Sequence, residues 1–487
     1  GSRAFMAAYN SWNGIPMSIH PCLEEITRKQ WGNNGIICTD GGALKLLIEA
    51  HKSFPSFAEG AAAVVKATTG QFLDAYVPYV KEALEKGLLT EVDIDKAIRG
   101  NIFVALKLGL LDGDNSRNPY LSIGKNSTET PPFMTAEARR LAREVTAKSV
   151  VLLKNKKLLP LDAGKLRKIA VIGPYSDKIV QDWYSGTPPY ETTILSGIRN
   201  AVKEGTEIIH AEDNRMGQAE KAAAAADVAI VCVGNHPYGT RADWKFSPVP
   251  SDGREAVDRK SLMLPDEDLV KLVLKANPNT ILVLVSSFPY TINWSQEHVP
   301  AIVHITHCSQ EQGNGLADVL FGKVNPAGRT VQTWVKDITD LPDIMDYDIR
   351  NGRTYMYHQG PVLYPFGYGL SYSDFAYEKI ESFKQDKKNI RVTVSVKNTS
   401  GRDGEEVVQL YASYPESKVE RPSKQLRAFR RIPIKAGETR KVTLTVPKEE
   451  LGYWNEGKQM FVVEPGTVKL LIGASSEDIR LEGKIRL

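Results

Sequence analysis

The stretch GIICTDGG, residues 35–42, decides how the first part of the chain folds. Its apolar run Gly35–Thr39 has the length and composition of a buried strand. Asp40 follows that run directly, and two glycines then leave room for a ligand beside it. Carboxylates at the carboxyl ends of parallel strands are where barrels and open α/β sheets build active sites. Asp40 is therefore a candidate catalytic residue, with a cap for a helix beginning at Ala43 as the alternative.

The sequence on both sides of this stretch alternates strand and helix patterns. A second strand is predicted at Phe5–Asn10, and helices are predicted over Cys22–Trp31, Phe57–Thr68, Leu73–Lys86 and Glu91–Leu108. Such alternation is typical of a parallel sheet with crossover helices. A polar stretch rich in turn-forming residues follows. We therefore expect a first domain over residues 1–112 and a linker over residues 113–134.

Residues 135–345 form a second segment with longer and more apolar strand patterns. A helical pattern over Ala136–Leu153 opens it, and strands are predicted at Lys168–Ile172, Glu207–His210, Asp227–Gly234, Thr280–Ser286 and Ala301–His307. Near-continuous runs of Val and Ile are what a sheet covered on both faces requires. The segment therefore predicts an α/β domain with a largely parallel sheet.

Residues 375–487 form a third segment, in which the hydrophobic period changes to two. Ile390, Val392, Val394 and Val396 alternate with polar residues, and turn signals separate this run from later ones. Short alternating strands of this kind are typical of an antiparallel β-sandwich. Residues 346–374 are then a second linker. Three domains agree with a length of 487 residues at about 150 residues per domain.

Composition and charge exclude several classes of partner. The 62 basic and 58 acidic residues leave a net charge of +4, spread along the chain, which is too little for a nucleic-acid footprint. Apolar runs such as Val228–Val233 are far shorter than the roughly 20 residues that span a bilayer. The sequence has no HExxH or zinc-ribbon spacing. We therefore expect no nucleic-acid or membrane partner, no metal and no cofactor.

A second candidate carboxylate, Glu255, lies in a long polar loop. The loop covers Asn235–Leu264, and unstructured loops beyond about 12–15 residues are uncommon in compact domains and often functional. It places aromatic residues such as Trp244 beside acids, which suits a sugar because rings pack on its C–H faces while carboxylates bind its hydroxyls. The alternative is a solvated loop in which Asp258 and Arg259 neutralise each other.

Several stretches resemble motifs of one enzyme family. Ala7–Pro16 resembles SYN-x-x-NG-x-P, and Trp31–Asp40 resembles WGF-x-G-x-VVSD, whose aspartate is the nucleophile. Glu255–Arg259, followed by Leu264 and Pro265, is similar to EG-x-DR…LP, which holds the acid/base. Further family-like stretches, in family order, are Asn325–Arg329, Gly352–Tyr355 and Tyr364–Tyr372. Nearly the whole chain thus resembles glycoside hydrolase family 3, the family of β-glucosidases and β-xylosidases.

The resemblance implies an architecture for the three segments. Residues 1–112 would be the C-terminal part of a TIM-like (β/α) barrel, residues 135–345 an α/β sandwich, and residues 375–487 a fibronectin-III-like β-sandwich. The barrel would supply Asp40, and the loop of the α/β sandwich would supply Glu255. We expect these two residues to meet across a domain interface, a typical place for a ligand pocket.

The resemblance also implies retaining hydrolysis by double displacement. Asp40 would attack the anomeric carbon while Glu255 protonates the leaving oxygen, and Glu255 would then act as base for the water that cleaves the intermediate. In this mechanism the two carboxyl groups lie roughly 5–5.5 Å apart. Asp40 must start ionised and Glu255 protonated, so we expect Glu255 in the less solvated environment.

The expected substrate is a xylo-oligosaccharide. Many β-glucosidases of the family carry Trp after the nucleophile, whereas Gly41 stands here and resembles the β-xylosidase branch. We expect an exo-acting β-xylosidase, with a β-glucosidase as the alternative. Substrate binding is assigned to Tyr9, His20, Trp244 and Arg254, although His20 equally fits a structural histidine.

The first segment departs from the family plan. A TIM barrel takes about 250 residues, whereas the segment that resembles it here ends at residue 112. We expect that the N-terminal part of the barrel is missing. The alternative to a competent enzyme is therefore an inactive fragment whose partner is that missing N-terminal segment, and a second copy of the chain is a further candidate partner. A secreted or periplasmic location is expected, with the cytoplasm as the alternative.

Overall fold

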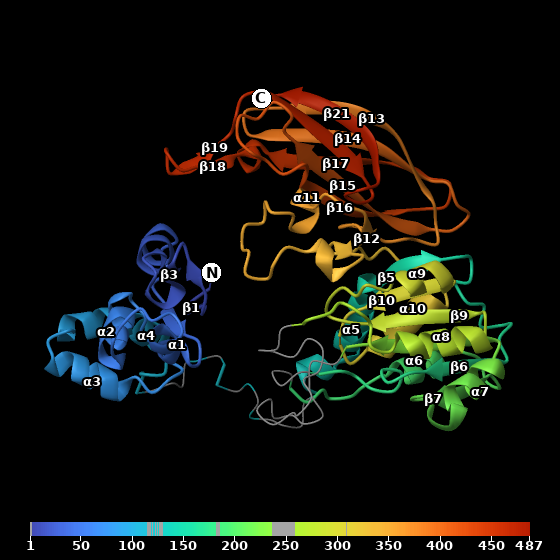
Figure 1. The fold of residues 1–487 in the computed structure, drawn as a ribbon, viewed down its shortest axis with the longest axis horizontal. Coiled ribbons are helices and arrows are strands. Elements are labelled where there is room, and N and C mark those ends of the chain that lie inside the picture. The colour runs from blue at the N-terminus through green and yellow to red at the C-terminus, as the bar shows by residue number, and fades with distance from the viewer. Residues whose placement is uncertain are drawn as a thin grey trace. The chain divides into compact units, whose positions relative to one another are not determined.

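The computed structural model divides the chain into two compact units. The residues that it describes are 2–113, 118, 120–121, 123, 125, 130–181, 186–235, 259–307 and 309–487. The first unit is residues 1–129 and the second is residues 130–487. Figure 1 labels the helices and strands of both units.

The first unit is built on a pair of parallel strands. Strand β1 (Ala4–Ala7) pairs in parallel with β4 (Ile36–Thr39). A bridge between Cys38 and Gln71 adds a third segment in the same direction. The strand predicted over Gly35–Thr39 is confirmed. The predicted buried strand at Phe5–Asn10 is shorter in the structure, and Met6 within it is 57% exposed, because alternate side chains of β1 face opposite sides.

Short elements connect the two strands, and helices follow them. Between β1 and β4 lie a hairpin of β2 (Ser11–Trp12) and β3 (Ile15–Pro16), a 3₁₀ turn at Met17–Ile19 and a π-helix over Leu23–Gln30. After β4 come α1 (Ala43–Glu49), α2 (Phe57–Lys66), α3 (Val77–Glu85) and α4 (Glu91–Lys107). Helix α3 begins later than the predicted Leu73. Pro78 lies in its first turn, where a missing N–H costs no hydrogen bond.

The second unit begins with a six-stranded sheet. Its order is β5 (Val151–Asn155), β10 (Ala301–Ile305), β9 (Thr280–Val285), β8 (Val228–Gly234), β6 (Lys168–Ile172) and β7 (Glu207–Ala211). All neighbouring pairs are parallel except β5 with β10. The helix predicted over Ala136–Leu153 is wrong at its end, since α5 (Ala136–Ser149) stops where β5 begins. In extended form Val151, Leu152 and Leu153 are all buried in the sheet.

Helices cover both faces of this sheet (Figure 1). Helices α5, α6 (Ile194–Ala201) and α10 (Gln312–Leu320) share one core with alternate strand residues such as Ile169 and Val171. Helices α7 (Gln218–Ala224), α8 (Glu267–Ala276) and α9 (Asn293–His298) share the other with Ala170 and Ile172. The predicted sheet with two covered faces is confirmed.

The C-terminal sandwich consists of two antiparallel sheets. One sheet contains β13 (Phe375–Gln385), β14 (Asn389–Asn398) and β17 (Thr439–Pro447). The other contains β16 (Gln425–Ile434), β15 (Gly404–Ser413), β20 (Thr467–Gly473) and β21 (Ile479–Arg486). Ile390, Val392, Val394 and Val396 are fully buried between the sheets, which confirms the period-two prediction.

Short elements complete the second unit. They are the strand pair β11 (Trp334–Val335) and β12 (Val362–Tyr364), helix α11 (Thr354–Tyr357), and the hairpin of β18 (Tyr453–Asn455) and β19 (Met460–Val462). The 3₁₀ turns are Pro132–Met134, Arg215–Gly217, Ile338–Asp340 and Lys448–Leu451.

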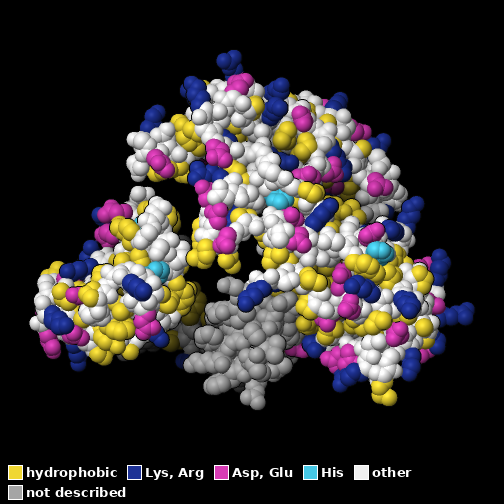
Figure 2. Space-filling model, in the orientation of Figure 1, with side chains coloured by type: hydrophobic (Ala, Val, Ile, Leu, Met, Phe, Trp, Pro, Cys, Tyr) yellow, Lys and Arg dark blue, Asp and Glu magenta, His cyan; other side chains and the backbone are white. Residues whose placement is uncertain are grey.

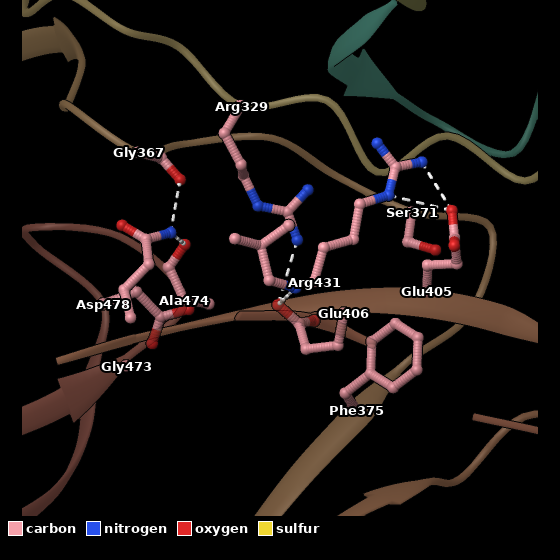
Figure 3. Close-up of polar contacts among 12 residues, drawn as sticks. Arg329, Gly367, Ser371, Phe375, Glu405, Glu406, Arg431, Gly473, Ala474 and Asp478 are labelled. Atoms are coloured by element: carbon pink, nitrogen blue, oxygen red, sulfur yellow. Dashed lines mark hydrogen bonds and ion pairs between the residues drawn. The ribbon is translucent and has the colours of Figure 1, made fainter. Parts of the chain in front are cut away.

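A buried ion pair joins the α/β part of the second unit to the sandwich (Figure 3). Arg329 donates to Glu406 over 3.0 Å, and their side chains are only 9% and 4% exposed. Nearby, the Gln409 amide donates to the carbonyl oxygens of Gly367 (3.0 Å) and Ala474 (2.6 Å). Breaking a buried pair leaves an uncompensated charge, so these contacts fix the sandwich to the α/β part.

Candidate active site

Asp40 lies at the carboxyl end of β4, as the sequence predicts. It is half-buried and is the first residue beyond the strand. The N–H of Gly41 donates to Oδ1 of Asp40 over 2.7 Å. Because this bond comes from the adjacent peptide group, the orientation of the carboxylate depends on the conformation of the turn that follows.

That turn is open on the side of its two glycines. Gly42 has φ of +81°, a left-handed conformation that glycine adopts at no steric cost, and it precedes the first residue of α1. Apart from the residues adjacent in sequence, a Cβ placed on Gly41 or Gly42 would meet no atom of the described residues within 4 Å. The space expected beside Asp40 is therefore present in the first unit.

Tyr9 contacts the same turn. Its hydroxyl donates to the carbonyl oxygen of Gly41, and the residue is 38% exposed. The carbonyl oxygen of Tyr9 lies 2.9 Å from Nε2 of His51. The structure thus brings two predicted site residues, Tyr9 and Asp40, to the two sides of Gly41.

His20 has other neighbours. Its ring stacks on Trp12 with centroids 4.7 Å apart, and its Nδ1 accepts the N–H of Cys22 over 3.0 Å. Nδ1 is therefore the unprotonated nitrogen when the ring is neutral. Among the described residues, no contact between His20 and Asp40 is found beside these two. The geometry therefore favours a structural role for His20.

Asp74 is a residue of this site that the sequence did not reveal. Its Oδ1 accepts the N–H of Gly42 over 2.5 Å, and its Oδ2 accepts the N–H of Leu44 over 3.4 Å. The sequence pattern placed Asp74 in a helix beginning at Leu73, whereas it lies in the loop before α3. Pro78 was the available signal, because proline marks the first turn of a helix.

The loop of the second candidate carboxylate lies largely outside the described residues, which include neither Glu255 nor the predicted site residues Trp244 and Arg254. Its two ends are described. Asn235, directly after β8, is 1% exposed and accepts the N–H of Ser287 over 3.0 Å through Oδ1. This end of the loop is thereby fixed to the segment that follows β9.

The other end of the loop is fixed to the same segment. The Arg259 guanidinium lies 3.8 Å from the ring centroid of Phe288 and 4.8 Å from that of Tyr290. Its Nη1 donates to the carbonyl oxygen of Pro289 over 3.2 Å. Both ends of the loop therefore rest on residues 287–290, at the carboxyl edge of the parallel sheet.

Histidines lie beside that segment. Nε2 of His304 is 3.1 Å from both the carbonyl oxygen and Oγ of Ser286, and Nδ1 of His307 is 3.1 Å from Oγ of Ser287. Burial of the ring, with His307 nearby, lowers the pKa of His304 to about 4. His304 also lines a cavity of about 420 Å³ with Trp334. This edge of the sheet is therefore polar but holds His304 neutral at pH 7.

Charge and hydropathy add little to the candidate site. On the face shown in Figure 2, Lys and Arg side chains are interspersed with Asp and Glu. Among the described residues, no three His, Cys, Asp or Glu side chains gather as metal ligands would. No helix within the described ranges is long and apolar enough to cross a membrane.

Family models match the chain in three successive parts. The glycosyl hydrolase family 3 N terminal domain matches residues 1–100, its C-terminal domain matches residues 150–372, and a fibronectin type III-like domain matches residues 406–476. Asp40 and Asp74 lie in the first match, and Asn235 and Arg259 lie in the second.

A curated relative extends this match to nearly the whole chain. The periplasmic beta-glucosidase of Salmonella typhimurium is 30% identical over 99% of this chain and 67% of its own length. This chain belongs to glycosyl hydrolase family 3. It is therefore a glycoside hydrolase. A beta-xylosidase of Formosa agariphila is 29% identical to this family 3 chain over 98% of it and 68% of the relative, so the chain spans about two thirds of both relatives.

Solved structures of the family have the same fold. A beta-glucosidase from Listeria innocua in complex with isofagomine is 26% identical and gives a TM-score of 0.84, covering 100% of the family 3 chain and 68% of the other. A b-glucosidase from Erythrobacter marinus is 26% identical and gives a TM-score of 0.82, covering 99% of this chain and 67% of the other. The predicted α/β domain and fibronectin-III-like sandwich are confirmed, and the barrel assignment of residues 1–112 stays a prediction.

Proposed function

We propose that this family 3 chain is a retaining β-glycosidase in which Asp40 is the nucleophile and Glu255 the acid/base. The names of its relatives, beta-glucosidases and beta-xylosidases, support a β-glycosidase. The observation that carries the proposal is the position of Asp40. Its carboxylate follows a parallel strand, is half-exposed beside an open glycine turn, and has one oxygen bound by the N–H of Gly41.

The reaction has two displacements at the anomeric carbon. Asp40 attacks that carbon as its bond to the leaving oxygen breaks, and Glu255 gives its proton to the leaving oxygen. A water then loses a proton to Glu255 and attacks the same carbon, which releases Asp40 as a carboxylate. The Gly41 N–H stays on Oδ1, which leaves Oδ2 of Asp40 for attack.

The proposed substrate is the non-reducing end of a xylo-oligosaccharide, cleaved in an exo manner. Gly41 after Asp40 supports this, because a glycine at this position resembles the β-xylosidase branch of the family, whereas many of its β-glucosidases carry Trp there. β-Glucosidase is the second candidate, supported by the names of the Salmonella and Listeria relatives. Tyr9, Trp244 and Arg254 are the proposed substrate-binding residues, and His20 ranks below them.

Further parts of the proposal concern the whole protein. Residues 1–112 are assigned to the C-terminal part of a TIM-like barrel, which the parallel pair β1–β4 and the family match to residues 1–100 support. A periplasmic or secreted location is proposed from the Salmonella relative, whose name is periplasmic beta-glucosidase.

Steady-state kinetics test the substrate. With 4-nitrophenyl β-D-xyloside and β-D-glucoside, we expect the xyloside to have the higher kcat/KM, by about 10-fold or more. A higher value for the glucoside would favour the second candidate. Turnover of neither substrate would contradict activity of this chain on its own.

A further inference from the structure

The peptide group between Gly41 and Gly42 is held at both of its polar ends. Its carbonyl oxygen, on Gly41, accepts a hydrogen bond from the hydroxyl of Tyr9. Its N–H, on Gly42, donates to Oδ1 of Asp74 over 2.5 Å. Tyr9 follows β1, and Asp74 follows the segment in which Gln71 bridges Cys38. Side chains from two other segments thus fix one peptide plane beside Asp40.

Without these two hydrogen bonds, the peptide between Gly41 and Gly42 has little to hold it in one conformation. Gly41 and Gly42 have no side chains, Gly42 is at φ of +81°, and the described residues, chain neighbours aside, leave the place of a Cβ open at both positions. Successive glycines have the widest choice of backbone conformations, so the turn has little of its own to keep it in one state. Any rotation of this peptide also turns Gly41, whose N–H orients Oδ1 of Asp40.

The carboxylate of Asp74 has a feature that an amide lacks. Oδ1 accepts the N–H of Gly42, and Oδ2 accepts the N–H of Leu44 over 3.4 Å. An asparagine has a single acceptor oxygen, so it could satisfy one of these two N–H groups and would turn a donor toward the other. Hydrogen bonds to a charged acceptor are also stronger than those to a neutral one.

We propose that Asp74 is a positioning residue for the nucleophile, acting through the Gly41–Gly42 peptide to hold the carboxylate of Asp40 in its attacking orientation. This inference rests on the proposed role of Asp40. Misplacement of a reacting group by about 1 Å costs on the order of 100-fold in rate. Loss of Asp74 therefore slows formation of the glycosyl-enzyme rather than the binding of substrate.

The competing role for Asp74 is a simple helix cap for α1. A matched control is available in the same unit, because Thr90 caps α4 by accepting the N–H of Asp93 over 3.3 Å, far along the chain from Asp40. Thr90→Ala removes a cap and its stability without touching the turn of Asp40. A capping role alone predicts that Asp74→Asn and Thr90→Ala behave alike.

The experiment measures the rate of inactivation by a 2-deoxy-2-fluoro-β-xyloside with a dinitrophenyl leaving group, which reports the first displacement. In the full chain, we expect Asp74→Asn to slow inactivation about 10-fold and Asp74→Ala about 100-fold, with KM for the nitrophenyl xyloside little changed. Thr90→Ala should lower the Tm and leave the inactivation rate within 2-fold (roughly) of the unmodified chain.

A variant that lacks the nucleophile, Asp40→Gly, separates a positioning role of Asp74 from general damage to the site. In Asp40→Gly the nucleophile is absent, and azide supplied in solution attacks the anomeric carbon while the aryl oxide leaves, giving an α-glycosyl azide. If Asp74 acts through the carboxylate of Asp40, adding Asp74→Asn to Asp40→Gly should change this azide reaction by less than about 2-fold.

Equal losses in the two backgrounds, an unchanged inactivation rate, or failure of Asp74→Asn to fold would each overturn the positioning role. Failure of the proposed function has a different signature. In that case Asp40→Gly keeps its activity without azide, or azide yields no α-glycosyl azide.

Discussion

The two carboxylates proposed for catalysis follow parallel strands in two different ways. Asp40 comes directly after β4, and its turn is held by Tyr9 and Asp74. Glu255 lies in the segment between Asn235, where the described chain stops after β8, and Arg259, where it resumes, and both of these residues are bonded to the segment after β9. The turn after Asp40 is thus fixed by bonds to its own peptide groups, whereas the contacts seen for the segment of Glu255 are those of its flanking residues, Asn235 and Arg259.

This contrast predicts how substitutions in the two segments should differ in their effects. Changes at or beside Asp40 alter the reacting group itself, so they should affect every substrate alike. Changes at the ends of the long loop alter only the placement of the acid/base, so their effect should be smaller and should depend on how much the leaving group needs a proton.

The largest effect is expected for Asp40→Asn. An amide cannot form the glycosyl ester, so kcat/KM should fall on the order of 10⁵-fold. Nitrophenyl xyloside kinetics measure this, with circular dichroism to verify the fold. Asp95→Asn, an exposed change on α4, is the control and should have no effect. Turnover at the unmodified rate in Asp40→Asn would remove Asp40 from the mechanism.

The next largest loss of kcat/KM is expected for Glu255→Ala, and its size should depend on the leaving group of the substrate. A substrate with a poor leaving group should lose about 10³-fold in kcat/KM, and one with a dinitrophenolate leaving group much less, because the latter departs without a proton. Asp252→Ala is the matched control in the same loop. Equal losses for both leaving groups in Glu255→Ala would show that another residue is the acid, and leaving-group dependence in Asp252→Ala would assign that role to Asp252.

Arg259→Ala should have an intermediate effect. It removes the stacking on Phe288 and Tyr290 and the bond to Pro289, a set of contacts of about 2 kcal/mol or on the order of 30-fold in rate. The loss should be greater for poor leaving groups, since the acid/base is displaced. Lys271→Ala is the control, because the Nζ of Lys271 lies 5.6 Å from the ring centroid of Trp294 on α9. A uniform loss for all leaving groups would show that Arg259 does not act through Glu255.

The smallest effect is expected on the pH dependence of folding stability, through His304 at the carboxyl edge of the sheet. Burial holds the pKa of His304 at about 4, whereas the unfolded chain protonates it near 6.5. As pH falls from 6.5 towards 4, the unfolded state gains a proton that the folded state does not take, so stability falls.

Urea unfolding at pH 7 and pH 5 should show about 1–2 kcal/mol of this loss. His304→Gln should remove that part of the pH dependence, and the exposed His298→Gln should not. The same pH dependence in His304→Gln as in the unmodified chain would refute the assignment.

Local patterns were sufficient for one half of the site. Asp40 could be found because a strand, a carboxylate and two glycines are consecutive, and the structure places it where that pattern predicts. The parallel sheet was found because its strands are continuous apolar runs. Strand β5 was missed because Val151–Asn155 directly continues a helical pattern, and only its pairing with β10 makes it a strand.

Long-range contacts explain what the sequence did not reveal. Asp74 acts on Gly42 across 32 positions of the chain, and no periodicity links the two. The sequence offers Asp258 as a neighbour of Arg259, but it does not reveal Phe288 and Tyr290, on whose rings the Arg259 guanidinium lies. Such partners are set by tertiary packing, which a single sequence does not display.

The proposed mechanism is tested most directly by identifying the residue that carries the sugar during catalysis. The chain is treated with the 2-deoxy-2-fluoro-β-xyloside, digested, and the labelled peptide is sequenced by mass spectrometry. We expect one label for each chain, on Asp40, and none in Asp40→Asn. A label on any other carboxylate, or undiminished labelling of Asp40→Asn, would contradict the proposed mechanism.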